Sequence, residues 1–203
     1  MPDKDEINSA LNGTGSAIEI NENGIKIPSG TVLDLGSVGK GIACDEVRGV
    51  LENSKIKRAV VSVGGSILLY GEGEKFTVGI RDPFSESSTE SFAVLTLPAT
   101  CVSTSGSYER YFDLDGVRYH HILDPKTGYP AESGLVSVTV VCSDGFMSDA
   151  LSTACFVLGY EKSLPLLEKY GAQAVFVFND RSVRVTGSLA DSFKLEKDGF
   201  KLL

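Results

Sequence analysis

The segment from Leu135 to Gly159 constrains the fold of this chain more than any other. It begins with the run LVSVTVVC, whose β-branched residues are typical of a strand. A short polar turn follows, and then a helical pattern from about Phe146 that ends at a glycine. The spacing places one set of side chains on a broad side of this helix: Phe146, Ala150, Thr153, Ala154 and Val157. A strand that leads directly into a helix predicts a chain of mixed helical and strand content.

Turn signals divide much of the remaining chain into short strands. An Asn-Gly pair within Ala17–Ile27 and an Asp-Gly pair within Tyr108–His121 each predict a hairpin. We expect helices over Asp3–Leu11 and Glu161–Tyr170, and a charged tail after Val185. Further strands are expected over Lys57–Val63, Phe76–Pro83, Phe92–Val102, Ala174–Asn179 and Ser182–Val185. The pattern predicts an α+β fold, with mixed, mostly antiparallel sheets and packed helices, in a single domain over residues 1–203.

Charge and hydropathy limit the partners and the compartment. A net charge of −8 and a pI near 4.8 argue against non-specific nucleic-acid binding. No apolar run reaches the length of a membrane span, and the acidic N-terminus does not resemble a signal peptide. We therefore expect a soluble chain, with a parent protein of the cell envelope or of the cytoplasm both left open. The four scattered cysteines are expected to be buried and reduced, which argues against a zinc site.

A glycine-rich turn precedes the first long helix. The run TVLDLGSVGKG predicts a short strand, a turn, and then a helix from about Ser37 to Asn53. With the strand at Lys57–Val63 this forms a βαβ-like unit, and the free N–H groups at its helix start favour an anion. The spacing matches neither a Walker loop nor a dinucleotide fingerprint. Two interpretations stay open: a phosphate site, or a plain turn with Lys40 in solvent.

Both histidines and a helical Asp/Thr pair lie within residues 119–153. His120 and His121 are adjacent on a strand, so they face opposite sides of the sheet and only one can face a site. Asp149 and Thr153 lie one helical turn apart and could present two oxygen ligands to a hard cation. The alternative is structural, because an early aspartate offsets the helix dipole and a helical threonine often bonds to a backbone carbonyl.

Several strings taken together resemble the ApbE family, the FAD:protein FMN transferases. They are LDLGSVGKGIACDEV, VVSVGGSI, VGIRDP, VSTSGSYERYF and YHHILDPKTGYPAESGLVSVTVVCSDGFMSDALSTACFVLG, in this order. The HILDPKTGYP block followed by SDALSTACFVLG is the most specific part, and the resemblance runs from about Asp3 onward. It implies a T-fold-like domain that uses Mg²⁺ to cleave FAD, transfers FMN to a Ser or Thr hydroxyl of an acceptor protein, and releases AMP.

The resemblance also implies a role for individual residues. Metal ligands would be the backbone carbonyl of Gly39 and the side chains of Asp149 and Thr153. His121 would be the base for the acceptor hydroxyl, and Asp149 belongs to the catalytic set. The residues expected to contact FAD are Gly36, Ser37, Gly39, Lys40, Ile42 and Leu123.

The match departs from the family pattern in two places, and other functions stay open. Ser66 stands where the family usually has an acidic or amide residue, and SVGK replaces the common GIAK. We also expect an N-terminal part of the family domain to be missing before Met1. A homodimer and a separate N-terminal part are therefore open as partners, beside the acceptor protein. The alternative functions are an FAD pyrophosphatase that yields FMN and AMP, and a non-catalytic flavin-binding module.

Overall fold

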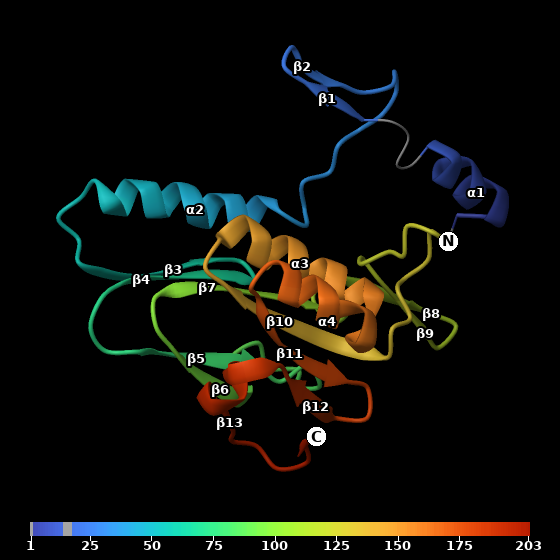
Figure 1. The fold of residues 1–203 in the computed structure, drawn as a ribbon. Coiled ribbons are helices and arrows are strands. Elements are labelled where there is room, and N and C mark those ends of the chain that lie inside the picture. The colour runs from blue at the N-terminus through green and yellow to red at the C-terminus, as the bar shows by residue number, and fades with distance from the viewer. Residues whose placement is uncertain (1, 14–17) are drawn as a thin grey trace.

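A seven-stranded sheet forms the centre of the molecule (Figure 1). The structure is a computed structural model that describes residues 2–13 and 18–203. The strand order is β14-β12-β11-β10-β7-β4-β3, and every neighbouring pair is antiparallel except β12 and β14. The strands are β3 (Arg58–Val63), β4 (Ser66–Gly71), β7 (Thr100–Gly106), β10 (Leu135–Cys142), β11 (Gln173–Phe178), β12 (Ser182–Val185) and β14 (Lys201–Leu202). The predicted α+β fold with mostly antiparallel sheets is confirmed.

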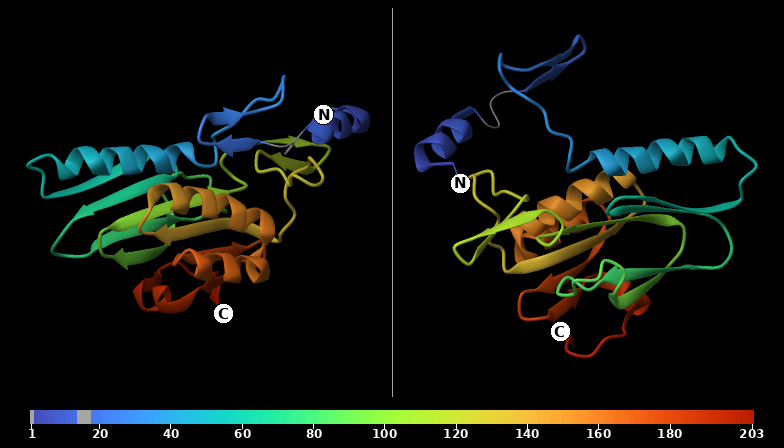
Figure 2. Two further views of the ribbon diagram at one scale, coloured as in Figure 1. Left: turned by 45° about the horizontal axis from the view of Figure 1, so that its top comes forward. Right: turned by 180° about the vertical axis from the view of Figure 1, so that it is seen from behind.

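Two layers cover the faces of this sheet (Figures 1 and 2). The helices α2 (Gly39–Glu52), α3 (Gly145–Leu158) and α4 (Tyr160–Lys169) lie on one face. A three-stranded sheet of β5 (Phe76–Arg81), β6 (Ser91–Leu97) and β13 (Phe193–Leu195) lies on the other, joined to the last strands by the 3-10 turn η1 (Gly187–Ser192). Strand β10 is buried between the two layers, which explains its continuous apolar sequence.

The N-terminal elements stand apart from the central sheet. Helix α1 (Lys4–Gly13) and the hairpin of β1 (Glu19–Asn21) and β2 (Gly24–Lys26) confirm the first predicted helix and hairpin, although Ala17 lies outside the described residues. Figures 1 and 2 both show β1 and β2 away from the sheet, and all their residues are exposed. The second predicted hairpin is β8 (Tyr111–Leu114) with β9 (Val117–His120), and it ends at the two histidines.

Three predicted elements differ in the structure. Residues 31–35 are not a strand, because no strand lies beside them; Val32 is 88% exposed. Strand β3 pairs with β4 as an antiparallel hairpin, so the βαβ-like unit is wrong. The expected strand at Phe92–Val102 divides near Pro98 into β6 and β7, which belong to different sheets. The predicted charged tail contains two short strands, of which β13 pairs with β6 and β14 with β12.

Helix α3 buries a different side from the one its apolar spacing predicts. Phe146 is 42% exposed, whereas Ser148 and Ser152 are fully buried. The buried residues of α3 are Gly145, Ser148, Asp149, Leu151, Ser152, Cys155 and Phe156. The reason is that strand β7 offers hydroxyl groups to the helix, so that serines on α3 are hydrogen-bonded when they are buried.

Candidate functional site

The first turns of α2 and α3 cross in direct contact at two glycines. A side-chain carbon on Gly41 would lie 2.1 Å from the carbonyl oxygen of Gly145. One on Gly145 would lie 2.6 Å from the carbonyl oxygen of Gly41. Both distances are shorter than any real contact, so only glycine allows this crossing. The close approach brings the N-terminal turn of α2 against the side chains of α3.

Each helix supplies a carboxylate that accepts hydrogen bonds from the first turn of the other. Asp45 of α2 accepts from the backbone N–H groups of Gly145 (2.9 Å) and Phe146 (2.7 Å). In return, Oδ2 of Asp149 on α3 accepts from the N–H of Gly41 at 3.0 Å. The first N–H groups of a helix have no partner within the helix, so these carboxylates satisfy them and also oppose the positive ends of the helix dipoles. The reciprocal capping fixes Asp149 beside the glycine-rich turn.

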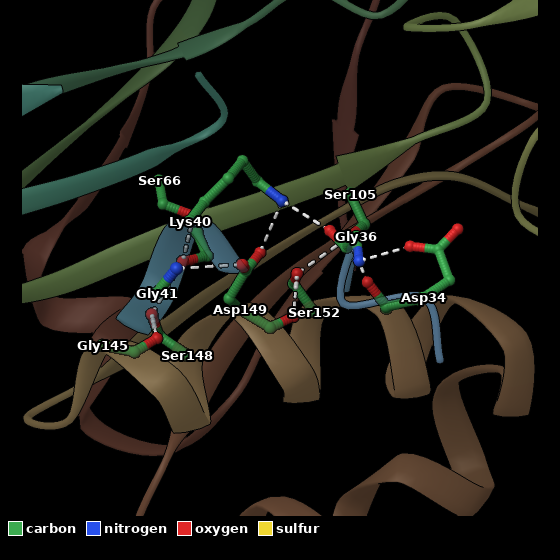
Figure 3. Close-up of polar contacts among 12 residues, drawn as sticks. Asp34, Gly36, Lys40, Gly41, Ser66, Ser105, Gly145, Ser148, Asp149 and Ser152 are labelled. Atoms are coloured by element: carbon green, nitrogen blue, oxygen red, sulfur yellow. Dashed lines mark hydrogen bonds and ion pairs between the residues drawn. The ribbon is translucent and has the colours of Figure 1, made fainter. Parts of the chain in front are cut away.

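The second oxygen of Asp149 faces Lys40 (Figure 3). Asp149 is 1% exposed, and its Oδ1 has no hydrogen-bond partner among the described residues. The Lys40 ammonium lies 2.9 Å from this oxygen as an ion pair, and the same ammonium donates to the carbonyl oxygen of Gly36 at 3.2 Å. Asp34 holds the turn itself, because its Oδ1 accepts from the N–H of Gly36 at 2.7 Å. A buried carboxylate therefore faces the turn, with one oxygen bonded to the backbone of α2 and the other paired with Lys40.

Hydroxyl groups connect α3 to the sheet below it. Ser105 of β7 lies 2.7 Å from the Ser152 hydroxyl and 3.1 Å from the Thr153 hydroxyl. Ser103, two residues earlier on the same strand, bonds to Ser66 at 2.9 Å and to Ser148 at 2.7 Å. We call Ser103 and Ser105 the β7 serines. Together they hold the helix at the depth where Asp149 faces the turn, and Ser105 also orients the hydroxyl of Thr153.

The two histidines differ in burial and in their contacts. His120 is partly buried with its ring edge-on to Phe156, and burial lowers its pKa, an effect that a backbone hydrogen bond with Ala131 partly opposes. His121 is exposed, and its Nδ1 lies 3.2 Å from the carbonyl oxygen of Arg110. A carbonyl can only accept, so Nδ1 is the donor in this contact, and in a neutral ring Nε2 is then the acceptor.

The remaining predicted site residues lie on two segments. Gly39 is the first residue of α2, and its N–H donates to the carbonyl oxygen of Leu35 at 2.7 Å. Ser37 and Ile42 flank this start and are exposed. Leu123 is 52% exposed and forms an isolated bridge with Pro130, just after His121. The described contacts join Gly36, Lys40 and Asp149, but they do not join His121 or Leu123 to that cluster.

Comparison with known proteins identifies the relatives of this architecture. The sequence model of the ApbE family matches residues 1–176. The chain belongs to the ApbE family. A curated FAD:protein FMN transferase of Treponema pallidum is 40% identical over 179 residues, which are 82% of this chain and 49% of that protein. One from Klebsiella pneumoniae is 36% identical over 175 residues, covering 86% of this chain and 54% of that protein.

Solved ApbE structures share the fold. The ApbE protein of Thermotoga maritima has a TM-score of 0.84 at 34% identity, with 95% of this chain and 64% of that chain covered. The apo form of the flavinyl transferase ApbE from Pseudomonas stutzeri has a TM-score of 0.77 at 30% identity, covering 97% of this chain and 63% of that one. The chain spans about half the length of the two curated relatives, at 49% and 54% of those proteins.

The donor groups of this ApbE-family site suit a hard cation. Among the described residues, no three His, Cys, Asp or Glu side chains gather around one point. The oxygen atoms at the turn are Oδ1 of Asp149 (which is paired with Lys40), the Thr153 hydroxyl one helical turn further on, and the backbone at Gly39. Ions such as Mg²⁺ take a few protein oxygens of this kind and complete their shell with water or phosphate. The residues present fit such an ion.

The sequence did not predict the residues that hold the two helices of the site in place. Asp45, Gly41 and Gly145 fix the crossing of α2 and α3, and the β7 serines orient α3. One signal was available: Ser103 and Ser105 alternate on a strand, so they face the same side. The pairing of Asp45 with the start of α3 had no such signal, because it depends on how two helices distant in sequence cross.

Among the helices that the structure describes, none has the length and hydropathy of a membrane span.

Proposed function

We propose that this chain transfers FMN from FAD to a Ser or Thr hydroxyl of an acceptor protein in a Mg²⁺-dependent reaction that releases AMP. The observation that carries the proposal is Oδ1 of Asp149, a buried carboxylate oxygen that faces a glycine-rich helix start and whose described partner is the partly exposed ammonium of Lys40. Relatives that share this family are FAD:protein FMN transferases. FAD is the substrate, and the acceptor protein is the second one.

The turn before α2 would hold the pyrophosphate of FAD. Helix N-termini attract phosphate through their N–H groups and their dipole. Gly36, Ser37 and Gly39 are exposed here, so phosphate oxygens can approach the backbone closely. The exposed Ile42 and Leu123 would contact the rest of the dinucleotide. The glycine-rich turn thus gives an acidic chain a local site for an anion.

Asp149 and Thr153, with the Gly39 carbonyl, would hold Mg²⁺. When bound there, the ion neutralises charge on the pyrophosphate and on the leaving phosphate. Phosphoryl transfer depends mainly on placement and charge neutralisation, which this small set of groups supplies.

His121 would take the proton from the acceptor hydroxyl. Its Nε2 has a free lone pair and lies on an exposed side chain that a protein acceptor can reach. The hydroxyl oxygen attacks the phosphorus of the FMN moiety, and a new phosphoester bond forms. The bond from this phosphorus to the bridging oxygen breaks, and AMP leaves with that oxygen.

The proposal is tested by following both products. The chain is incubated with FAD, Mg²⁺ and a flavin-acceptor protein, and in-gel flavin fluorescence is measured together with AMP release. We expect equal amounts of AMP and labelled acceptor, and loss of both with His121→Gln or with a chelator. A folded chain that yields neither product would contradict the proposal.

Hydrolysis is the second outcome that this assay separates. The exposure of His121 that admits an acceptor also admits water, which the same base could activate. AMP and free FMN without labelled acceptor would assign the chain as an FAD pyrophosphatase. Saturable FAD binding without AMP release would assign a flavin-binding module.

A further inference from the structure

Lys40 occupies the place that a cation would take at Asp149. We propose that its ammonium competes with the metal ion for Oδ1 of Asp149, and that the lysine displaced by the metal then binds the phosphate groups of the dinucleotide. This inference rests on the proposed function, since it concerns the same carboxylate. It implies an order of binding, because the metal must replace Lys40 at Asp149 before Lys40 can contact the substrate.

The contacts of Lys40 resemble those of a bound cation. Its Nζ lies 2.9 Å from Oδ1 of Asp149 and 3.2 Å from the carbonyl oxygen of Gly36. One carboxylate oxygen and one backbone carbonyl of a tight turn are also ligands that hard cations use. The ammonium thus joins α3 to the turn with the type of oxygen atoms that a metal ion would use (Figure 3).

Asp149 has only one oxygen available for a cation. Its Oδ2 already accepts from the N–H of Gly41, and the side chain is 1% exposed. A buried carboxylate is costly unless a positive charge compensates it, and either the ammonium or a metal ion can do so. Both at the same oxygen would repel each other at short range. Lys40 and the metal therefore exclude one another.

The lysine side chain has a route out of this position. It is 34% exposed, and its flexible stem passes the β3–β4 turn at Gly64, where a side-chain carbon would lie 3.2 Å from Cδ of Lys40. Lys40 starts at the second residue of α2, on the glycine-rich turn proposed to hold phosphate. An ammonium released from Asp149 therefore remains within reach of a dinucleotide bound at that turn.

The competition predicts opposite effects of one substitution on two ligands. In Lys40→Gln the carboxylate loses its internal cation, so Mn²⁺ as the test metal should bind about tenfold more tightly when no nucleotide is present. With saturating metal, the same variant should bind ADP, a pyrophosphate without flavin, about three- to tenfold more weakly. A lysine that only stabilised the fold would not strengthen metal binding when removed.

The experiment titrates Mn²⁺ into the full chain by calorimetry, and then titrates ADP at saturating Mn²⁺. Lys55→Gln is the matched control: it removes the same charge from an exposed residue just beyond the opposite end of α2. Asp149→Asn identifies the site, because it should abolish the Mn²⁺ binding under study. Circular dichroism melts of each variant establish that it is folded.

The outcomes separate the inference from the proposed function. Tighter Mn²⁺ binding in Lys40→Gln than in Lys55→Gln, with weaker ADP binding, supports the competition. If Asp149→Asn abolishes Mn²⁺ binding but Lys40→Gln binds no more tightly than its control, the inference is wrong and the metal site of the proposed function stands. If no variant binds Mn²⁺ in a way that depends on Asp149, both are overturned.

Discussion

The two oxygens of Asp149 do different work in this site. Oδ2 holds the first turn of α2 through the N–H of Gly41, which is a structural contact. Oδ1 is paired with the ammonium of Lys40, which makes it the atom for which a metal ion would compete. One residue therefore links the stability of the helix crossing to the chemistry proposed for the turn.

Substitutions at Asp149 should separate its structural contact with Gly41 from its proposed binding of a metal ion. Asparagine keeps an oxygen for the N–H of Gly41 but carries no charge, so we expect Asp149→Asn to cost about 1 kcal/mol of stability and to lose Mn²⁺ binding. Asp149→Ala leaves that N–H unpaired and should cost about 3 kcal/mol as well as the metal. Urea unfolding with parallel metal titration measures both effects. Metal binding retained in both variants would show that the ligand lies elsewhere.

The β7 serines differ in what they touch, which gives a matched pair of variants. Ser105→Ala removes the partner that orients the Thr153 hydroxyl, so Mn²⁺ should bind about tenfold more weakly. Ser103→Ala removes contacts with Ser66 and Ser148 only, and its metal affinity should match the unsubstituted chain. Both should cost about 1 kcal/mol of stability. Equal loss of metal affinity in the two variants would mean that Ser105 acts through general packing.

His120 should make stability depend on pH. Burial lowers its pKa in the folded chain below the value of about 6.5 in the unfolded chain. Its contribution is therefore present above pH of about 6.5 and is lost as the pH falls through the lower, folded-state pKa, because the unfolded chain takes up the proton first. Urea unfolding should show a cost of His120→Gln that is larger near pH 8 than near pH 5.

The exposed His121 gives the comparison for that series. His121→Gln removes the exposed imidazole next to His120 and is measured as the control at the same two pH values. A cost of His120→Gln that grew toward acid pH would mean that the folded chain favours the protonated ring. That result would contradict the assignment of His120 as the buried, neutral member of the pair.

Helices α2 and α3 form the site because they cross at glycines. The contact places Asp45 against the first turn of α3 and Asp149 against the first turn of α2, so each helix completes the other. The strand β7 below contributes the hydroxyls that hold α3 in place. At this scale the site depends on a distance between two backbones more than on any single side chain.

Gly41→Ala tests the crossing against a glycine of the same helix. The added carbon would meet the Gly145 carbonyl at 2.1 Å, which the backbone cannot relieve without moving a helix, so we expect a loss of about 3 kcal/mol or more. Gly49 has open space around its added carbon, so Gly49→Ala should stabilise α2 by about 0.5 to 1 kcal/mol. Thermal and urea unfolding compare the two. Equal effects would mean that the helices do not touch as described.

Local patterns in the sequence predicted the elements better than their contacts. Strand β10 and helix α3 match their predicted bounds closely, because β-branched runs and a terminal glycine are local signals. The buried side of α3 differs from the predicted side. Its serines can be buried because they form hydrogen bonds with hydroxyl groups of β7, a strand distant in sequence. The strand expected at residues 31–35 failed for the same reason: an apolar run becomes a strand only beside another strand.

The site residues divide in the same way. Alternation predicted opposite faces for His120 and His121; in the structure β9 ends at His120, which is partly buried, and His121 follows it as an exposed residue. Helical spacing placed Asp149 and Thr153 one turn apart on α3, and their role as metal ligands stays a prediction. The contact of Asp45 with α3 and the glycine crossing could not be predicted. Both arise only when α2 and α3, which strands β3 to β10 separate in the sequence, come together in space.

At the scale of the whole molecule, the sheet order gathers the site from distant parts of the chain. Strand β7 lies between β4 and β10, so its serines lie under the helix that follows β10. Helix α2 lies on the same face of the sheet as α3, over β3, β4 and β7. This position brings the glycine-rich turn at the start of α2 next to α3. The hairpin of β8 and β9 carries His121 to its exposed position. The central claim is that this arrangement binds FAD through a cation at Asp149.

The most direct test of that claim is calorimetric titration of the chain with FAD, with and without Mg²⁺. We predict saturable binding that is strongly favoured by Mg²⁺, and loss of the Mg²⁺ effect in Asp149→Asn. FAD binding that is equally tight without the metal, or unchanged in Asp149→Asn, would contradict the account.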